Sequence, residues 1–133
     1  MSGPADPAEP ESAYDLFTRG SDLLAHRHPG AAAVLLERCL SLEPGKASIL
    51  EALGRAYYDL GDHGLAAEHF RAMVDANPLA DYAHFGLGLA SLRIGDADAS
   101  RRHLRMAVFL KPENEDYRRA LHRLEASGRA TPP

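Results

Sequence analysis

The stretch ILEALGRAYYDLGD, Ile49 to Asp62, is repeated in outline by AHFGLGLASLRIGD, Ala83 to Asp96, and the two begin 34 residues apart. Apolar residues recur in the first stretch at the spacing of one helix face. Both stretches end in Gly-Asp, a pair that breaks a helix and begins a turn. A helical sequence pattern that recurs after a fixed interval indicates that the chain is built from a repeating structural unit.

Proline and glycine carry the same interval across most of the chain. The prolines that follow three successive apolar runs are Pro44, Pro78 and Pro112. The glycines inside three predicted helices are Gly20, Gly54 and Gly88. A glycine inside a helix costs about 1 kcal/mol relative to alanine, so its recurrence suggests that each one admits a neighbouring helix. The small residues expected to meet these glycines on the following helices are Ala32, Ala66 and Ser100.

The composition is that of a single globular domain. The 133 residues are 45% hydrophobic and 26% charged, with a formal net charge of −4. A general affinity for phosphate backbones is therefore not favoured. Residues 1–96 hold 7 Lys and Arg against 14 Asp and Glu, whereas residues 97–133 hold 8 against 5. The basic character is concentrated toward the C-terminus.

Signals for secretion or membrane insertion are missing from the pattern. The opening residues show no basic segment followed by an apolar one, and the longest apolar run, residues 31–36, is far below the roughly 18–20 residues that a membrane span requires. Cys39 is the only cysteine, so no intramolecular disulfide can form, which favours a reducing compartment. We therefore expect a soluble cytoplasmic protein. The abundance of Ala, Arg and Gly suggests a bacterial source.

The periodic positions resemble the tetratricopeptide repeat, a unit of the same length with Leu-Gly and Tyr in its first helix and Ala, Phe and Pro in the second helix and its exit. The middle repeat matches at Leu53, Gly54, Tyr57, Ala66, Phe70 and Pro78. The third repeat keeps Leu87, Gly88, Ala107 and Pro112. The first repeat is the weakest and keeps Gly20, Ala32 and Pro44.

This resemblance implies an all-α fold, a right-handed solenoid of three helix hairpins followed by a C-terminal capping helix. The expected single domain spans residues 12–127. Its segments are repeats at about 13–46, 47–80 and 81–114 and a capping helix at about 114–126. Polar, Pro-rich and Ala-rich tails at 1–11 and 128–133 are expected to be disordered.

The resemblance also implies a concave surface lined by the first helix of each hairpin. Carried onto this chain, the expected peptide-binding groove consists of Tyr14, Phe17, Arg55, Tyr58, Tyr82, Phe85, Leu89, Arg93, Arg119 and Arg123. Such a groove suits a segment that combines apolar anchors with acidic residues or a carboxylate. The same spacings also suit aromatic side chains packed in the core, and the last two arginines also suit a solvated polar face.

One specific family function is not supported by the residues. The subset that grips the acidic C-termini of heat-shock chaperones places Lys, Asn and Arg at five groove positions. The corresponding residues are Phe17, Ser21, Ala52, Tyr82 and Gly86. The clamp for those C-termini is therefore absent.

No catalytic, cofactor-binding or metal-binding constellation is predicted. Cys39 stands where the family has a small buried residue, which favours a packed thiol over a nucleophile. His26 and His28 lie in a predicted turn, but no third ligand lies near them in the sequence. We expect a non-enzymatic protein without a cofactor.

Two classes of function remain open. The first is an adaptor or scaffold that binds a protein or peptide partner in the concave groove, with a secretion-chaperone-like binder of apolar segments as a narrower form. The second is a structural protein that assembles with copies of itself, for example as a homodimer. Nucleic-acid binding through Arg101, Arg102 and Arg105 is disfavoured, and no membrane association is expected.

Overall fold

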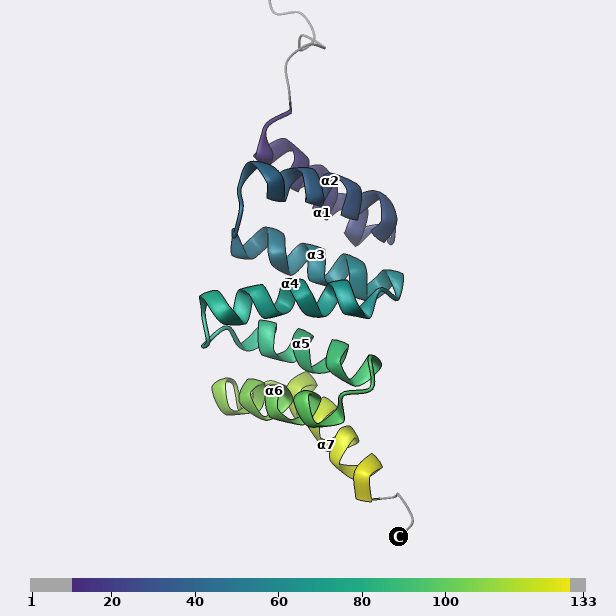
Figure 1. The fold of residues 1–133 in the computed structure, drawn as a ribbon, viewed down its shortest axis with the longest axis vertical. Coiled ribbons are helices and arrows are strands. Elements are labelled where there is room, and N and C mark those ends of the chain that lie inside the picture. The colour runs from purple at the N-terminus through teal and green to yellow at the C-terminus, as the bar shows by residue number, and fades with distance from the viewer. Residues whose placement is uncertain (1–10, 130–133) are drawn as a thin grey trace, which may run out of the picture.

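The computed structural model describes residues 11–129, and these residues form seven helices and no strand (Figure 1). The helices are α1 (Ala13–Ala25), α2 (Pro29–Leu42), α3 (Ala47–Leu60), α4 (His63–Ala76), α5 (Asp81–Arg93), α6 (Ala97–Leu110) and α7 (Glu115–Arg129). The predicted all-α class is confirmed for this part of the chain. The tail predicted at 1–11 lies outside the described residues except for Glu11, and residues 130–133 of the second predicted tail also lie outside them.

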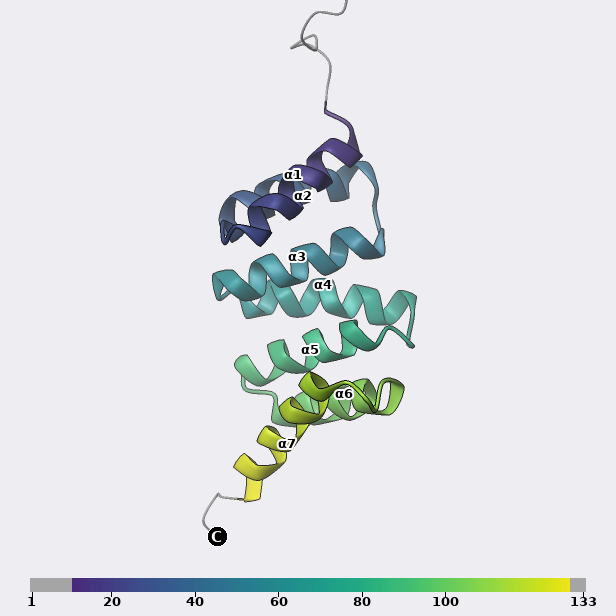
Figure 2. The same cartoon turned by 180° about the vertical axis from the view of Figure 1, so that it is seen from behind.

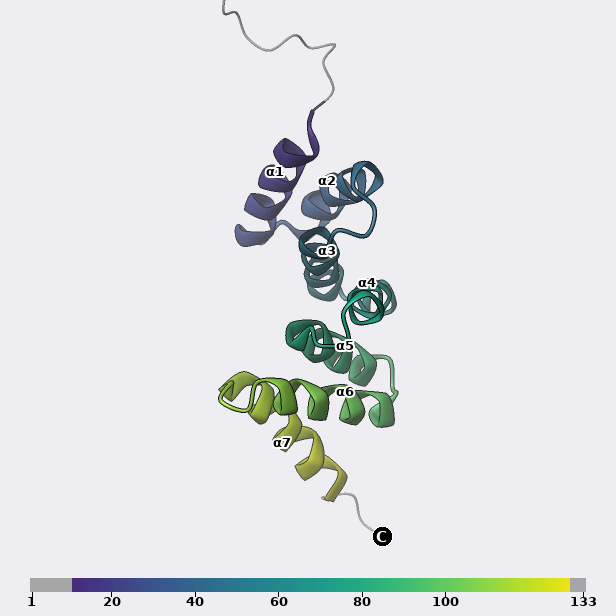
Figure 3. The same ribbon diagram turned by 90° about the vertical axis from the view of Figure 1, so that its left-hand side faces the viewer.

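Consecutive helices pack against each other and stack along the long axis of the molecule (Figure 1). Turned by 90°, the stack shows α1 and α3 along one side and α2 and α4 along the other (Figure 3). The view from behind brings α7 in front of α6 (Figure 2). Contacts between elements further apart in the sequence are fewer, and the main ones between backbones join α1 to α3 and α3 to α5. Each helix therefore depends mainly on its sequence neighbours for burial.

The turns between paired helices use a left-handed residue at the same interval of 34. Gly61 and Gly95 have φ values of 83° and 90°, a region that glycine enters without a steric penalty. The corresponding residue of the first turn is Arg27, which has a φ of 64°. A side chain in this conformation costs about 1–2 kcal/mol. The first turn therefore keeps the backbone geometry of the others with a less suitable residue.

Four helices begin with a side chain that caps the first turn. In each case its oxygen accepts a hydrogen bond from the backbone N–H three residues further on, at 3.0–3.2 Å. The capping residues are Ser12 for α1, Asp62 for α4, Asp96 for α6 and Asn114 for α7. Such a cap contributes about 1 kcal/mol to helix stability. The Gly-Asp pairs thus end one helix and cap the next.

Large side chains of the next helix pack against the periodic glycines Gly20, Gly54 and Gly88, whereas the sequence predicts small ones. A Cβ atom at Gly54 would lie 2.6 Å from Cζ of Phe70. At Gly20 and Gly88 the nearest atoms belong to Leu36 and Leu104, at 2.9 and 2.8 Å. The predicted approach of a neighbouring backbone is found at Gly20, where a Cβ would lie 3.6 Å from the Ala32 oxygen, and at Gly88, where it would lie 3.3 Å from the Leu104 nitrogen. The predicted small partners Ala66 and Ser100 are not among the nearest atoms. These small residues are fully buried, one helical turn before the large ones that fill the space above the glycines.

Phe70 occupies a special position because a second glycine receives the same ring. A Cβ atom at Gly86 of α5 would also lie 2.6 Å from the Phe70 ring. The ring of this α4 residue therefore lies against the backbones of α3 and α5 at once. It is 2% exposed and belongs to the core cluster that also contains Leu50, Leu87 and Ala90. One side chain thus joins the second hairpin to the third.

The single cysteine is part of a buried cluster that also contains Leu16, Leu36 and Leu53 and that we call the N-terminal core. Cys39 is buried, and its Sγ donates to the backbone carbonyl of Ala13 at 3.2 Å. Burial raises the pKa of the thiol, which disfavours the reactive thiolate. Leu40 and Tyr57 pack against both this core and the core around Phe70, so apolar packing is continuous between the two. The thiol is a packed group, as the sequence predicts.

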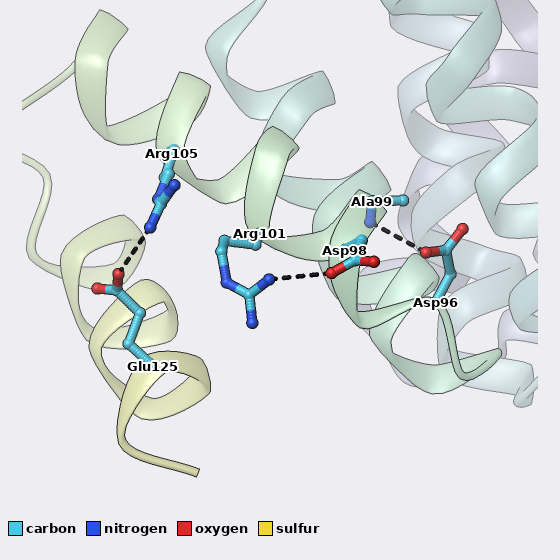
Figure 4. A network of polar contacts seen from close by, with 6 residues as sticks. All are labelled: Asp96, Asp98, Ala99, Arg101, Arg105 and Glu125. Atoms are coloured by element: carbon cyan, nitrogen blue, oxygen red, sulfur yellow. Dashed lines mark hydrogen bonds and ion pairs between the residues drawn. The ribbon is translucent and has the colours of Figure 1, made fainter. Parts of the chain in front are cut away.

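The last helix is tied to α6 by an ion pair between Arg105 and Glu125 at 3.3 Å (Figure 4). The same view shows Arg101 pairing with Asp98 within α6. Both pairs are largely exposed, and exposed pairs contribute at most about 1 kcal/mol each. Helix α7 runs to Arg129, three residues beyond the predicted end at Ala126, so that Gly128 is helical.

A pair of histidines lies between α5 and α6. His84 is buried, and its Nε2–H donates to the carbonyl of Pro78 at 2.8 Å. Nδ1 of His84 then accepts from Nδ1–H of His103 at 3.1 Å. Burial, and then the neighbouring His84, Arg71 and Arg102, lower the pKa of His103 to about 4. The folded protein therefore holds His103 in its neutral form.

We predict that Gly54→Leu lowers the free energy of unfolding by at least about 2 kcal/mol. The added Cβ alone would collide with Phe70, and this ring cannot move without disturbing Gly86. Gly64→Leu is the matched control, because a Cβ there meets only one atom within 4 Å, a carboxylate oxygen of Asp62 at 4.0 Å. Thermal and denaturant unfolding measure both variants. Equal stability of the two would contradict the packing described for Phe70.

We also predict that His103 makes the free energy of unfolding decrease as the pH is lowered. Its folded pKa of about 4 lies below the unfolded value of about 6.5, so the unfolded chain binds the proton first. The stabilisation is complete above the unfolded pKa and is lost as pH falls from about 6.5 to about 4. Denaturant unfolding across this range should show a steeper loss for the natural protein than for His103→Gln. Equal slopes for the natural protein and His103→Gln would refute the assignment.

Candidate functional site

A pocket of about 180 Å³ lies between α3 and α5, above the ring of Phe70. We call it the central pocket. Its lining residues are Arg55, Tyr58 and Asp59 from α3, Phe70 from α4, and Tyr82, Phe85, Gly86 and Leu89 from α5. Five of the ten predicted groove residues meet here, namely Arg55, Tyr58, Tyr82, Phe85 and Leu89.

Helical spacing places these residues on facing surfaces. Arg55, Tyr58 and Asp59 are three and four positions apart, so they share one face of α3. The α5 residues follow the same rule, because Gly86 and Leu89 lie one and two turns beyond Tyr82. The Phe70 ring reaches the pocket because Gly86 has no side chain that would cover the ring. The close packing of Phe70 thus forms the base of the hollow.

Aromatic rings continue from the base of the pocket to the last helix. The ring centroids of Phe70 and Tyr82 are 6.1 Å apart, and those of Tyr82 and Phe85 are also 6.1 Å apart. Phe85 in turn lies 4.7 Å from the ring of Tyr117 in α7. These separations are typical of attractive tilted and edge-to-face ring contacts. One wall of the pocket is therefore held in place by packing rather than left mobile.

Tyr117 is fixed by a hydrogen bond to the start of α5. Its hydroxyl donates to Oδ2 of Asp81 at 2.6 Å, and the side chain is buried. Burial, together with the hydrogen bond to the Asp81 carboxylate, raises the pKa of Tyr117 and keeps its hydroxyl protonated. The contact joins α7 to α5 behind Phe85. The last helix thus supports the wall of the central pocket.

One guanidinium group and one carboxylate line the pocket, and a second guanidinium group contacts a lining residue. Arg55 makes no ion pair within the described part of the chain and lies near Tyr82, where it partly offsets the rise in the tyrosine pKa caused by burial. Nε of Arg93 donates to the hydroxyl of Tyr58 at 3.3 Å, and its guanidinium carbon lies 6.0 Å from the centre of that ring. Asp59 is the acidic residue in the lining. The pocket can therefore receive a carboxylate at Arg55, and Arg93 lies next to it against Tyr58.

The N-terminal part of the predicted groove is separate from the central pocket. Tyr14 and Phe17 line another hollow, of about 260 Å³, together with Ser48 and Ile49 of α3. Tyr14 is 77% exposed, whereas Phe17 is half-buried and packs against the N-terminal core. The alternative reading of an aromatic residue as core packing therefore applies to Phe17 in part and not to Tyr14.

The two predicted groove arginines of α7 differ from each other. Arg119 forms ion pairs with Asp116 at 3.3 Å and Glu115 at 3.9 Å on its own helix. Arg123 lines a C-terminal cavity between α5, α6 and α7, which has a volume of about 260 Å³. This cavity is lined by Leu89, Leu92, Leu104, Ala120, Arg123, Leu124 and Ser127. The structure thus brings Arg123 near the groove residue Leu89 and leaves Arg119 within a local network.

Several residues of the site were not among those predicted. Asp59 follows Tyr58 on the same helix face and was detectable by its spacing. Phe70 was assigned only a packing role by the repeat pattern, although its ring forms the base of the pocket. The contact between Tyr117 and Asp81 joins residues 36 positions apart, and no periodic signal marks it.

The described part of the chain offers few sites for metal ions, membranes or large ligands. Among residues 11–129, no group of three His, Cys, Asp or Glu side chains lies close enough to hold a metal ion. No helix in this part is both long and apolar enough to cross a bilayer. A cavity of about 150 Å³ holds a benzene ring, whereas sites for drug-sized molecules measure roughly 300–1,000 Å³. The central pocket, at about 180 Å³, therefore has the size of one large side chain.

Comparisons with known proteins agree with the repeat pattern. The tetratricopeptide repeat model matches residues 17–81 and again residues 51–115. No curated protein matches the chain. Solved structures with a similar fold include the first repeat domain of Spaghetti (RPAP3) bound to the HSP90 peptide SRMEEVD, with a TM-score of 0.84, 15% identity, and coverage of 90% of this chain and 94% of that one.

Two further structures show the same fold. The Sgt2 repeat domain from Aspergillus fumigatus has a TM-score of 0.83 and 22% identity, over 98% of this chain and 91% of that one. MamA has a TM-score of 0.84 and 20% identity, over 91% of this chain and 71% of that one. At these identities the likeness concerns the fold.

We predict that Tyr117→Phe lowers the free energy of unfolding by about 1.5–3 kcal/mol, the range for a hydrogen bond to a charged group. The variant removes only the hydroxyl and leaves the half-buried Asp81 carboxylate without its donor. Tyr14→Phe, which removes the hydroxyl of an exposed tyrosine, should be close to neutral. Denaturant unfolding compares the two, and a neutral Tyr117→Phe would show that the contact does not support the last helix.

Proposed function

The chain belongs to the tetratricopeptide repeat family, and we propose that it is a non-enzymatic adaptor that binds a peptide segment of a partner protein in its concave groove. In this proposal α1–α6 are three repeats of a right-handed solenoid, and α7 is the cap. The proposed site comprises Arg55, Tyr58, Tyr82, Phe85, Leu89 and Arg93. The aromatic and arginine residues at its ends extend it only where a long segment is bound, namely Tyr14, Phe17, Arg119 and Arg123.

The central pocket is the observation that carries this proposal. It has the volume of one large side chain, its walls are aromatic and aliphatic, and Arg55 stands at its mouth without an ion pair in the described structure. An apolar side chain flanked by a carboxylate would match all three features. Aromatic contacts and the fixed Tyr117 hold the walls before a ligand arrives, which reduces the entropy lost on binding.

The repeat domain of Spaghetti (RPAP3) supports peptide binding as a class, because that protein was solved with the HSP90 peptide SRMEEVD. The heat-shock clamp is nevertheless absent from this chain, since Phe17, Ser21 and Ala52 occupy three of its positions. Tyr82 and Gly86 occupy the other two and instead line the central pocket. We therefore propose a ligand with a large apolar anchor, in place of a chaperone C-terminus held mainly by charge. A chaperone of secreted proteins is a narrower form of this proposal.

A second candidate function, self-assembly, is favoured by one exposed surface. Phe109 and Met106 of α6 are 78% and 40% exposed, one helical turn apart. At the position of Phe109 the two earlier repeats carry Asp75 and Ser41. Contiguous exposed apolar side chains are the kind of patch that marks a contact surface, and these two lie next to each other on α6. A homodimer or filament through α6 is the alternative that the adaptor proposal must exclude.

The proposed setting is a reducing cytoplasm, in a bacterial cell. The absence of a possible disulfide within the chain supports the compartment, and the composition supports the source. Nucleic acid and membranes are not part of the proposal. No cofactor is required by it.

The adaptor proposal predicts that selection from a phage library of random linear peptides enriches sequences that bind the central pocket. The groove variant Arg55→Glu/Tyr58→Ala should weaken the enriched peptides at least tenfold. The matched control Arg102→Glu/Phe109→Ala makes the same two kinds of change on the exposed face of α6 and should bind them normally. Circular dichroism verifies that both variants remain helical.

Three results would contradict the adaptor proposal. They are the enrichment of no peptide by the natural protein, equal binding by the groove variant, and loss of binding in the α6 variant alone. Light scattering tests the second candidate in the same samples. A mass that rises with concentration and is restored to that of one chain by the α6 variant would support self-assembly.

A further inference from the structure

The C-terminal cavity has the character of a second anchor site. Leu89 and Leu92 of α5, Leu104 of α6 and Leu124 of α7 form its apolar lining. Leu104 and Leu124 are buried, whereas Leu92 is 41% exposed at the edge. The volume of about 260 Å³ exceeds that of the central pocket and suits one large apolar side chain.

The cavity adjoins the central pocket through a shared residue. Leu89 lines both hollows, and Leu92 lies one helical turn further along α5 in the cavity alone. A chain bound over α5 can therefore place one side chain on each side of Leu89. The second of these would contact α7, the helix that the repeat pattern assigns only a capping role.

The charge around the cavity selects the kind of segment. Arg123 is the charged residue of the lining, and it makes no ion pair within residues 11–129. The neighbouring Arg119, by contrast, is paired with Asp116 and Glu115. Along the same surface, Arg93 contacts the Tyr58 hydroxyl and no carboxylate of the described chain. An apolar hollow bordered by an unpaired guanidinium group is complementary to an apolar side chain next to a carboxylate.

We propose that the C-terminal cavity binds a second apolar anchor of the same partner segment, followed by an acidic side chain that pairs with Arg123. This inference rests on the proposed function, because it takes the segment to be bound already at the central pocket. The partner is thus a polypeptide with two large apolar residues and an acidic residue after the second. Helix α7 is part of the binding surface as well as the end of the array.

Three single variants of α7 test this inference. Ala120→Phe fills the apolar cavity from the side of α7 and leaves the central pocket unchanged. Arg123→Glu reverses the charge at its border. Arg118→Glu is the matched control, since Arg118 is exposed on the same helix and lines neither hollow. Arg123 is also exposed, so its replacement tests the inference even if Ala120→Phe perturbs folding.

The measurement is peptide selection with each variant from one phage library. The peptides are joined to the coat protein through their C-terminal ends, so side chains supply the only carboxylates. The natural protein and Arg118→Glu should enrich sequences with two apolar positions and an acidic residue after the second. Ala120→Phe should keep the first apolar position and lose the second. Arg123→Glu should lose the acidic preference and bind peptides selected by the natural protein roughly tenfold more weakly, the size of one charge-assisted hydrogen bond.

The outcomes separate this inference from the proposed function. Identical motifs selected by the natural protein, Ala120→Phe and Arg123→Glu would overturn the second anchor site while leaving the central pocket in place. Motifs with one apolar position, or without an acidic residue, would also overturn it. Failure of the natural protein to enrich any peptide would overturn both proposals together. Equal weakening by Arg118→Glu and Arg123→Glu would show that only the net charge of α7 matters.

Discussion

The ring of Phe70, held between Gly54 and Gly86, is the contact on which the rest of the structure depends. Either glycine, given a Cβ atom, would meet the ring at 2.6 Å. Their lack of side chains lets α3 and α5 approach α4 from both sides, which brings the second and third hairpins together. The same approach leaves the ring as the base of the central pocket. The core and the candidate site therefore share the side chain of Phe70. A substitution there changes both the packing between the hairpins and the shape of the central pocket.

Much of the fold followed from the interval of 34 residues. The Gly-Asp pairs at Gly61 and Gly95 placed two turns, and the structure shows why both residues are needed, since the glycine is left-handed and the aspartate caps the next helix. The same interval placed the periodic glycines, but it could not show what fills the space above them. A pattern along one helix reports which positions are small, whereas Leu36, Phe70 and Leu104 reach them from another helix through their length. Gly86, the second glycine against Phe70, has no counterpart in the repeat pattern.

The candidate site was only partly accessible to sequence reasoning, for a similar reason. Five of the predicted groove residues line one pocket, because each lies on one face of a regular helix, namely Arg55, Tyr58, Tyr82, Phe85 and Leu89. Tyr14 and Phe17 were assigned to the same groove, yet they line a different hollow beside Ile49, because position on a face does not determine where one hollow ends and another begins. Two further features depend on how α7 lies across α5 and α6. They are the hydrogen bond between Tyr117 and Asp81 and the cavity lined by Arg123. That angle is a property of tertiary packing and leaves no mark in the periodicity.

The stacking of helices in sequence order converts a linear charge distribution into a spatial one. Residues 11–96 carry 7 Lys and Arg against 12 Asp and Glu, whereas residues 97–129 carry 8 against 5. Because α1 and α7 lie at opposite ends of the long axis, the opposite net charges of these two segments give the molecule an electric dipole along its length (Figure 1). An acidic chain approaching in solution would be turned by this field and would arrive at the α6 and α7 end first. The orientation of the encounter is thus set before any side chain touches, and it weakens as salt screens the field.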